Sequence, residues 1–352
     1  MTGRHKIAWK PQNYEARVAS VRIRCLKPLR ALRRQGMPIE LYRERHERDY
    51  RLIIFSKAYH SRDVELARRL KARGVKIVFD LCDNHFLLAE ERVARLKTMF
   101  GLADHWVVSS DALAEVVREQ VPLERPLTVI EDAVETELHG PLLDLPGRFR
   151  AAAQLHRLRR FLEAPGHREA LHLVWFGNHK ASYGDSGLAH MQKLRPLLER
   201  LHAGGRLTLT VISNSREAFD AVFGDWTLPL CYLDWSAHNF FDALRCHDVA
   251  VIPIEQNAFT RVKTNNRIAL SLSLGLGVVA DAIDSYQVFS ACAFLDDWEG
   301  GLSAYLEDRS LIRRHADCAA AVIGERFSLP VIAARWQALI EDALAPARSL
   351  SE

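Results

Sequence analysis

The chain has 352 residues, of which 48% are hydrophobic and 26% charged, with a net charge of +4. This composition is typical of a soluble globular protein, and the length favours two domains over one. No stretch reaches the roughly 20 apolar residues that a membrane span needs, and the start MTGRHKIAWKPQ is not a signal peptide. We therefore expect a cytoplasmic protein.

The first 138 residues alternate between strand and helix patterns, which is typical of a parallel α/β domain. Apolar runs predict strands at 5–10, 37–42, 50–57, 74–82, 105–110 and 126–132. Helical spacing predicts helices at 19–36, 62–74, 85–103 and 111–120, the last with Ser110 or Asp111 as its N-cap. We expect 1–138 to form one Rossmann-like domain.

This N-terminal part is strongly basic. Residues 1–73 hold 20 Lys/Arg and 7 Asp/Glu, a net charge of +13, so the other residues carry −9. Such a surface can attract anionic lipid, an acceptor with a pyrophosphate, or nucleic acid. Nucleic acid is the weaker hypothesis, because few aromatic residues stand between the arginines. Alternatively, arginines such as Arg30 and Arg68 form solvated helix faces.

Residues 139–170 are predicted to link two domains. The segment is rich in proline and glycine and contains the basic helical pattern RFRAAAQLHRLRRFLE. Its apolar positions are Phe149, Leu155, Leu158, Phe161 and Leu162. This helix could lie on a membrane surface, but the modest apolar face favours packing against a neighbouring domain.

The second half repeats the alternation. Strands are predicted at 171–178, 206–214, 231–235, 248–254 and 277–281, and helices at 191–204, 240–247 and 264–275. We expect 171–326 to form a second Rossmann-like domain, with a ligand cleft between the two. A last helix, 329–344, lies in the segment 327–352 and could lean back across the junction.

A polar loop follows the strand at 248–254, at the strand end where open α/β sheets bind ligands. The next helix begins near Thr264, and its N-terminus suits a phosphate. A simple helix cap would need only one polar residue, whereas this loop carries several. They are Glu255, Gln256, Asn257, Thr260, Arg261, Lys263, Thr264, Asn265 and Asn266.

These features together resemble the GT-B glycosyltransferases, more narrowly the "glycosyl transferases group 1", family 4-like type. The resemblance rests on the two Rossmann-like halves, the FGN turn at 176–178 and the run DVAVIP...KTNNRIALSLSLGLGVVAD. It implies a two-domain α/β fold that faces a cleft. It also implies transfer of a sugar from a nucleotide-sugar donor, which is a co-substrate, with no metal and no other cofactor.

The resemblance places the donor on the C-terminal domain. Gly177 and Asn178 match the turn that approaches the diphosphate, with Lys180 as a candidate counter-charge. Asn214 falls where the nucleotide borders the next strand, and Trp235 falls near the base, although a lone tryptophan can equally pack in the core.

The family pattern has two glutamates separated by seven residues, and this chain departs from it. Glu255 fits the first, but Lys263 stands at the second. A lysine cannot accept bonds from ribose hydroxyls. It could instead pair with donor phosphate, helped by Thr264 and Asn265, as in relatives whose helix begins Lys-Ser/Thr-Asn.

The resemblance also points to acceptor and catalytic groups in the N-terminal domain. FDLCDNHF, at 79–86, resembles the family's strand-end His-Asp loop, so Asp80 is an acceptor contact and Asp83 or His85 is the base if the enzyme inverts. The same residues could merely cap a turn. Arg22 and Arg24 match an SxRxR run that lies near the acceptor in relatives.

We therefore expect a cytoplasmic glycosyltransferase, which its basic N-terminal domain could hold at the inner face of a membrane. Its acceptor would be a glycan or lipid-linked molecule in surface polysaccharide biosynthesis. Two alternatives stay open: a 2-epimerase acting on nucleotide sugars, and a subunit that binds a sugar nucleotide without catalysis.

The six cysteines predict free thiols in a reducing compartment and no structural zinc, because no CxxC pair or Cys/His cluster occurs. They are Cys25, Cys82, Cys231, Cys246, Cys292 and Cys318.

Overall fold

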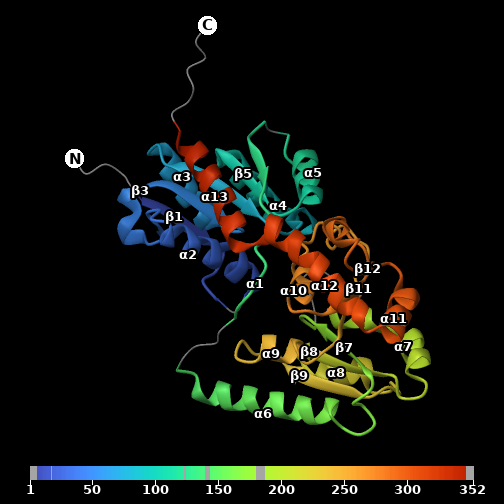
Figure 1. The fold of residues 1–352 in the computed structure, drawn as a ribbon. Helices are drawn as coiled ribbons and strands as arrows, with labels where there is room; N and C mark the ends of the chain where they lie inside the picture. Colours follow the sequence, from blue (N-terminus) through green and yellow to red (C-terminus); the bar gives the residue numbers. More distant parts are fainter. Residues whose placement is uncertain (1–5, 17, 123, 139–142, 180–186, 346–352) are drawn as a thin grey trace. The chain divides into compact units, whose positions relative to one another are not determined.

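The computed structural model describes residues 6–16, 18–122, 124–138, 143–179 and 187–345 (Figure 1). The chain divides into two compact units. Unit 1 comprises Met1–Val134, Arg261–Thr264 and Glu325–Glu352, and unit 2 comprises Glu135–Thr260 and Asn265–Gly324. Each unit is a parallel sheet covered by helices, so the predicted pair of Rossmann-like folds is confirmed.

The sheet of unit 1 has six parallel strands in the order β2-β1-β3-β4-β5-β6. Its strands are β1 (Lys6–Pro11), β2 (Ile39–Leu41), β3 (Tyr50–Ser56), β4 (Lys76–Leu81), β5 (His105–Val108) and β6 (Leu127–Val129). The central strands β4 and β5 are buried almost throughout, as their apolar, β-branched sequences predict.

The helices of unit 1 cover both faces of the sheet. They are α1 (Ala19–Val21), η1 (Arg22–Leu26), α2 (Lys27–Arg34), η2 (Glu44–Asp49), α3 (Ser61–Ala72), η3 (His85–Leu87), α4 (Glu90–Leu102), α5 (Asp111–Gln120), η6 (Ile323–Phe327) and α13 (Leu329–Leu344). Side chains of α3, α4 and α5 form the core on one face, and side chains of α2 and α13 form it on the other.

Helix α13 returns the end of the chain to unit 1. Trp336 of α13 is fully buried, and its ring lies 4.7 Å from that of Trp9 in β1. Ile332 and Ile340 join the same core. The return of the C-terminal helix to the first half of the chain, expected from the sequence, is therefore confirmed.

The sheet of unit 2 also has six parallel strands, in the order β12-β11-β10-β7-β8-β9. They are β7 (Leu171–Phe176), β8 (Leu207–Ser213), β9 (Leu230–Asp234), β10 (Val249–Ile252), β11 (Gly277–Ala280) and β12 (Phe294–Leu295). All four residues of β10 are buried, which confirms the prediction for this strand.

The helices of unit 2 include a long one, α6, which packs against β9 and α9. They are α6 (Leu145–Leu162), η4 (Gly187–Leu194), α7 (Arg195–His202), α8 (Arg216–Phe223), α9 (Phe240–Leu244), α10 (Asn266–Ser273), η5 (Asp284–Phe289), α11 (Trp298–Glu307) and α12 (Ser310–Val322). After α10 the chain turns at Gly275, whose φ of +87° favours glycine. At Gly277, a Cβ would come within 2.7 Å of the Tyr305 ring.

Two predicted helices are broken. The segment expected as one helix at 85–103 is a short 3₁₀ turn, η3, followed by α4, because Leu88 and Ala89 adopt extended dihedral angles. The segment expected at 19–36 is helical from Ala19 to Arg34 but contains the π-helical turn η1. Such turns are frequent at functional sites, and this one carries Arg24.

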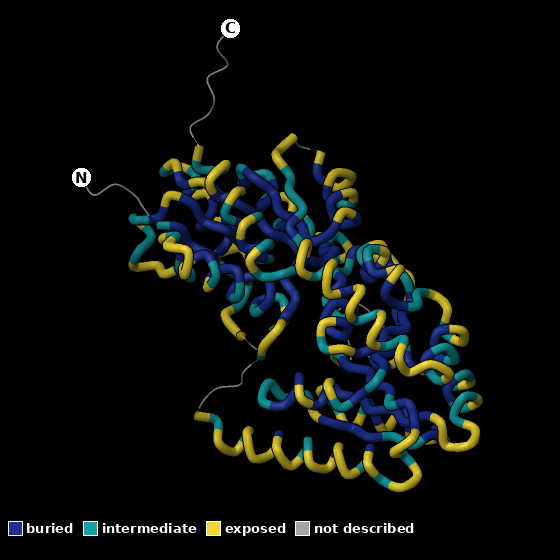
Figure 2. Tube along the Cα trace, in the orientation of Figure 1, coloured by how far each residue is buried: buried dark blue, intermediate teal, exposed yellow. Residues whose placement is uncertain are grey.

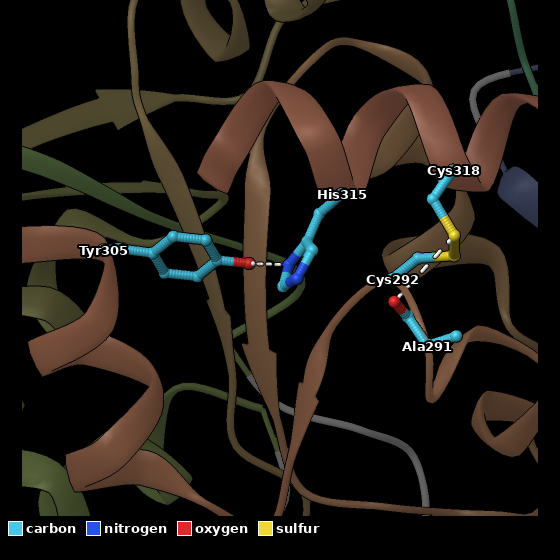
Figure 3. Close-up of a disulfide and its surroundings, with 5 residues drawn as sticks. All are labelled: Ala291, Cys292, Tyr305, His315 and Cys318. Carbon is cyan, nitrogen blue, oxygen red and sulfur yellow. Dashed lines mark hydrogen bonds between the residues drawn. A yellow bond between two sulfur atoms is a disulfide. The ribbon is translucent and has the colours of Figure 1, made fainter. Parts of the chain in front are cut away.

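The prediction of six free cysteines was wrong. Cys292, after η5, forms a disulfide with Cys318 on α12, with a Cα–Cα distance of 5.8 Å (Figure 3). The fold brings together two cysteines that the chain separates by 26 residues, which no local spacing reveals. Cys25, Cys82, Cys231 and Cys246 are free. The cysteines thus no longer argue for a reducing compartment.

Among the residues described, no helix combines the length and apolarity that crossing a bilayer requires.

Candidate functional site

An open hollow lies at the carboxyl edge of the sheet of unit 2. The chain runs from β7 outward to β9, then resumes with β10 on the other side of β7. Open α/β sheets bind ligands at such a topological switch point. The hollow starts beside the end of β10, extends past β11 and β12, and has a volume of about 540 Å³. This volume is typical of small-molecule sites.

Polar side chains from several elements line this hollow. They are His190, Gln192 and Lys193 of η4, Glu255 and Gln256 after β10, Asp281 after β11 and Asp296 after β12. Lys193 forms an ion pair with Asp281, and its ammonium lies 5.8 Å from the ring centre of Trp298. Glu255 lies 3.5 Å from the His190 ring, and its side chain is 60% exposed. The hollow therefore offers hydrogen-bond donors and acceptors to a ligand that enters it.

The predicted donor residues Gly177, Asn214 and Trp235 lie on neighbouring strand ends. Ser213 Oγ donates to the Gly177 carbonyl at 2.9 Å, and Trp235 N donates to the Ser213 carbonyl at 2.7 Å. Asn214 Oδ1 accepts from the backbone N–H of His179 at 2.9 Å. These contacts bring the ends of β7, β8 and β9 together, and the donor role of the three residues stays a prediction.

The other predicted donor residues differ in their exposure and in the unit to which they belong. Asn178 is exposed after β7, while Asn265 is buried as the N-cap residue of α10 and makes no side-chain cap bond. Thr264 is half-buried at the end of the segment that belongs to unit 1. Lys180 lies outside the described residues.

Part of the polar loop after β10 stabilises the loop itself. Asn257 Oδ1 accepts from the backbone N–H groups of Phe259 and Thr260, both at 2.9 Å. Thr260 Oγ1 accepts from Asn257 N at 3.0 Å and donates to the Glu255 carbonyl. The excess of polar residues, which suggested a ligand, is therefore explained in part by this turn.

A second polar cluster lies in unit 1, centred on Asp83 after β4. The ammonium groups of Lys57 and Lys263 both form ion pairs with its carboxylate. Lys263 reaches Asp83 because its segment is held in unit 1 by buried Val262, whose carbonyl accepts from Ser110 Oγ at 2.8 Å. Two ammonium groups thus meet at the end of β4, where a phosphate group could compete with the Asp83 carboxylate for them.

The titration behaviour of this cluster follows from its burial and charges. Burial alone raises the pKa of Asp83, but Lys57 and Lys263 outweigh it and hold the pKa well below its usual range. Burial, reinforced by Lys57, lowers the pKa of His85 to about 3. His85 Nδ1 lies 2.8 Å from the Tyr59 hydroxyl. At neutral pH the carboxylate is therefore charged and the imidazole neutral.

Arg24 and Asp80, both predicted to contact the acceptor, contact each other. Arg24 is 2% exposed, and its Nε donates to Asp80 Oδ1 at 2.7 Å. Its Nη1 also donates to the Ile130 carbonyl at 2.6 Å and to Asp132 at 3.2 Å. These bonds occupy the guanidinium inside unit 1. Arg22, in contrast, is half-buried and donates to the Ala16 carbonyl at 3.1 Å.

The network fills the topological switch point of unit 1, between β1 and β3. Ser56, at the end of β3, donates to Asp80 Oδ2 and accepts from Trp9 Nε1, both at 2.7 Å. Only about 20 Å³ of space remains beside Arg24, Asp80 and Ser56. The acceptor role of Arg24, Asp80 and Arg22 stays a prediction.

Several polar residues of these sites were not singled out in the sequence, among them Lys57, Asp281 and Lys193. Lys57 and Asp281 directly follow strands, so the strand-end rule applied at 248–282 could have found both. Lys193 lies within a helical pattern and gave no signal. Among the described residues, no group of three or more His, Cys, Asp or Glu side chains is arranged to hold a metal ion.

No protein-family profile matches the chain, and no curated protein sequence matches it significantly. Solved structures do. A glycosyltransferase from Rickettsia africae has a TM-score of 0.64 at 12% identity, covering 98% of this chain and 100% of its own. Sucrose-phosphate synthase from Thermosynechococcus elongatus has a TM-score of 0.61 at 14% identity, covering 85% and 75%.

A UDP-forming α,α-trehalose-phosphate synthase from Burkholderia xenovorans has a TM-score of 0.58 at 14% identity, with coverage of 85% and 75%. At such identities the likeness shows the fold. The two six-stranded parallel sheets and these neighbours make the fold GT-B, as the resemblance implied.

Proposed function

We propose that this protein transfers a sugar from a nucleoside-diphosphate sugar to an acceptor hydroxyl. The observation that carries the proposal is the open hollow at the carboxyl ends of β10, β11 and β12, in a GT-B fold. Its lining combines the apolar Ala189 and Ile254 with polar side chains, which suits a nucleotide sugar, and its volume lies in the range of small-molecule sites. The UDP-forming neighbour makes UDP-sugars the first donors to test.

We propose that positive side chains, without a metal ion, stabilise the leaving nucleoside diphosphate. Lys263 is the main candidate. Its side chain is 35% exposed even though it pairs with Asp83. A phosphate oxygen would compete with Asp83 for this lysine, and a charge-assisted bond of this kind is strong.

Asp83 and His85 suit a role other than general base. Efficient proton transfer needs a pKa near the working pH, and both groups titrate far below it. Asp83 instead holds Lys57 and Lys263 in place, and the donor phosphate assists deprotonation of the acceptor, so we propose retention of anomeric configuration. We extend the proposal to a glycan or lipid-linked acceptor in surface polysaccharide biosynthesis, which the basic N-terminal part would attract.

A donor screen tests the proposal. The protein is incubated with UDP-, GDP- and dTDP-sugars, with and without EDTA and an acceptor extract, and release of nucleoside diphosphate is measured. We expect turnover of one donor class that EDTA does not reduce. Binding without turnover would favour the non-catalytic subunit, interconversion of the donor sugar would favour the epimerase, and loss with EDTA would refute metal independence.

Lys263→Ala then tests the phosphate contact. Its donor affinity should fall by roughly 1–3 kcal/mol, because a charge-assisted bond is lost. Lys97→Ala, at an exposed lysine of α4, is the matched control and should bind donor normally. Unchanged donor affinity in Lys263→Ala, measured by calorimetry, would refute the role of Lys263.

A further inference from the structure

Helix α6 has one face packed against unit 2. Ala151, Leu158 and Leu162 are buried. Asn239 Nδ2 donates to the Ala151 carbonyl at 2.8 Å, and an Arg157 guanidinium nitrogen donates to the Tyr232 carbonyl at 3.1 Å. At the start of the helix, Asp144 accepts from Gly147 N at 2.9 Å and pairs with His238. The helix is therefore anchored to unit 2.

The opposite face of α6 is exposed and partly apolar (Figure 2). Leu143 is 94% exposed, Phe149 76% and Leu145 57%. The two other large hydrophobic side chains exposed in the described chain, Tyr14 and Leu87, stand apart from this group at 50% each. Single exposed apolar residues are ordinary, but three within seven residues mark an interaction surface.

Charge surrounds this apolar face. Helix α6 holds five arginines and not one Asp or Glu. By helical spacing, Leu145, Phe149 and His156 share the outer side, opposite Ala151 and Leu158. Four of the arginines lie around this outer side: Arg148 and Arg159 on one flank, Arg150 on the other, and Arg160 beside His156. The fifth, Arg157, bonds to unit 2.

We propose that this face of α6 docks on an anionic lipid bilayer, with Leu143, Leu145 and Phe149 entering the boundary between headgroups and acyl chains. An apolar strip flanked by cations is the pattern of helices that lie in a membrane interface. The arginines meet lipid phosphates at the level of the headgroups. Nucleic acid fits less well, because exposed leucines would find no apolar partner along a phosphate backbone.

The inference goes beyond the proposed function and does not depend on it, since docking requires no turnover. It places the membrane-binding surface on unit 2, not on the basic N-terminal part that the sequence suggested. An enzyme docked in this way would meet acceptors that are held in a bilayer.

The test uses sedimentation of the full chain with vesicles of phosphatidylglycerol and, separately, of phosphatidylcholine. We expect binding to the anionic vesicles only, weakened by salt. Leu145→Ser/Phe149→Ser should lower this affinity by about tenfold or more, because two inserted side chains are lost. Arg148→Glu/Arg150→Glu should lower it similarly, while acidic residues near a helix N-terminus keep α6 stable.

Two matched variants serve as controls. Tyr14→Ser/Leu87→Ser removes exposed apolar side chains elsewhere, and Arg30→Glu/Arg33→Glu reverses exposed charges on α2; both should bind as the parent does. Circular dichroism and donor hydrolysis, measured on every preparation, report folding and activity separately from docking.

Failure of the parent to bind phosphatidylglycerol would overturn the proposal, and so would normal binding by the α6 variants. Loss of binding in the α2 variant alone would move the surface to unit 1. If the parent binds single-stranded RNA but no vesicles, and the α6 variants lose that RNA binding, the face serves nucleic acid instead.

Discussion

The two units have sheets of the same size and a topological switch point each, but they use these places in opposite ways. In unit 1 the crevice between β1 and β3 is filled by Arg24, which pairs with Asp80 and Asp132. In unit 2 a hollow of about 540 Å³ lies beside the switch point, at the carboxyl ends of β10, β11 and β12. In one and the same architecture, a position that often binds ligands can thus be occupied by internal hydrogen bonds. The fold alone therefore does not show which of the two units binds a ligand.

Backbone strain occurs on both sides of this comparison. Among the described residues other than glycine, only Lys57 and Asp296 have positive φ, +54° and +58°. Lys57 follows β3 beside the filled crevice, and Asp296 follows β12 at the rim of the hollow. Strain of this kind costs about 1–3 kcal/mol and collects at functional sites. Unit 1, whose crevice is filled, therefore still has a strained backbone of the kind found at functional sites, at Lys57, which pairs with Asp83.

The largest effect should come from emptying the filled crevice. Arg24→Met should lower the free energy of unfolding by about 3–5 kcal/mol, because Asp80 and Asp132 would remain buried without their partner. Urea denaturation measures it, with Arg22→Met, at a half-buried neighbour, as the control. Near-parental stability together with weaker acceptor binding would instead restore the acceptor role of Arg24.

A smaller effect on the free energy of unfolding should appear as the pH is lowered. The folded-state pKa of His85 lies near 3, below the usual value of 6.5, so the unfolded chain takes up a proton first as the pH falls. Its contribution to stability is complete above about pH 6.5 and is lost toward pH 3, with about 2 kcal/mol lost by pH 5.

Urea midpoints measured across this pH range should be flatter in His85→Gln than in the parent. His247 of unit 2, whose burial lowers its pKa to about 4, should maintain part of the slope in both proteins. Identical slopes for the variant and the parent would contradict the buried, neutral state of His85.

The smallest effect on stability should come from the open side. Lys193→Ala removes a partly exposed ion pair with Asp281, so the free energy of unfolding should change by less than about 1 kcal/mol. Donor affinity, measured by calorimetry, should nevertheless fall. Arg195→Ala, which removes an exposed pair with Asp225 outside the hollow, should leave donor affinity unchanged. Equal donor affinity in both variants would indicate that the hollow does not bind the donor.

The fold was largely predictable, because each strand predicted from apolar runs is present. The two-residue β12 was missed since it is too short to form a pattern. The site was predictable only in part. Polar residues after β4 and β10 were found, whereas Lys57 after β3 and Asp281 after β11 were missed. Nothing local in the sequence shows that Lys263 meets Asp83, 180 residues earlier. Arg24 was expected near the acceptor because its SxRxR run resembles that of relatives, but its two carboxylate partners, Asp80 and Asp132, lie 56 and 108 residues away in the sequence.

The return of α13 to unit 1 has a consequence for the synthesis of the protein. A ribosome makes the first 134 residues, then all of unit 2, before it makes the helix that covers Trp9. The N-terminal half must therefore wait, with one apolar face of its sheet covered in part by α2 alone, until Trp336 and Ile340 emerge. Unit 1, which is translated first, is therefore completed last. A chain that stopped before residue 329 would leave the part of this face that α13 covers exposed.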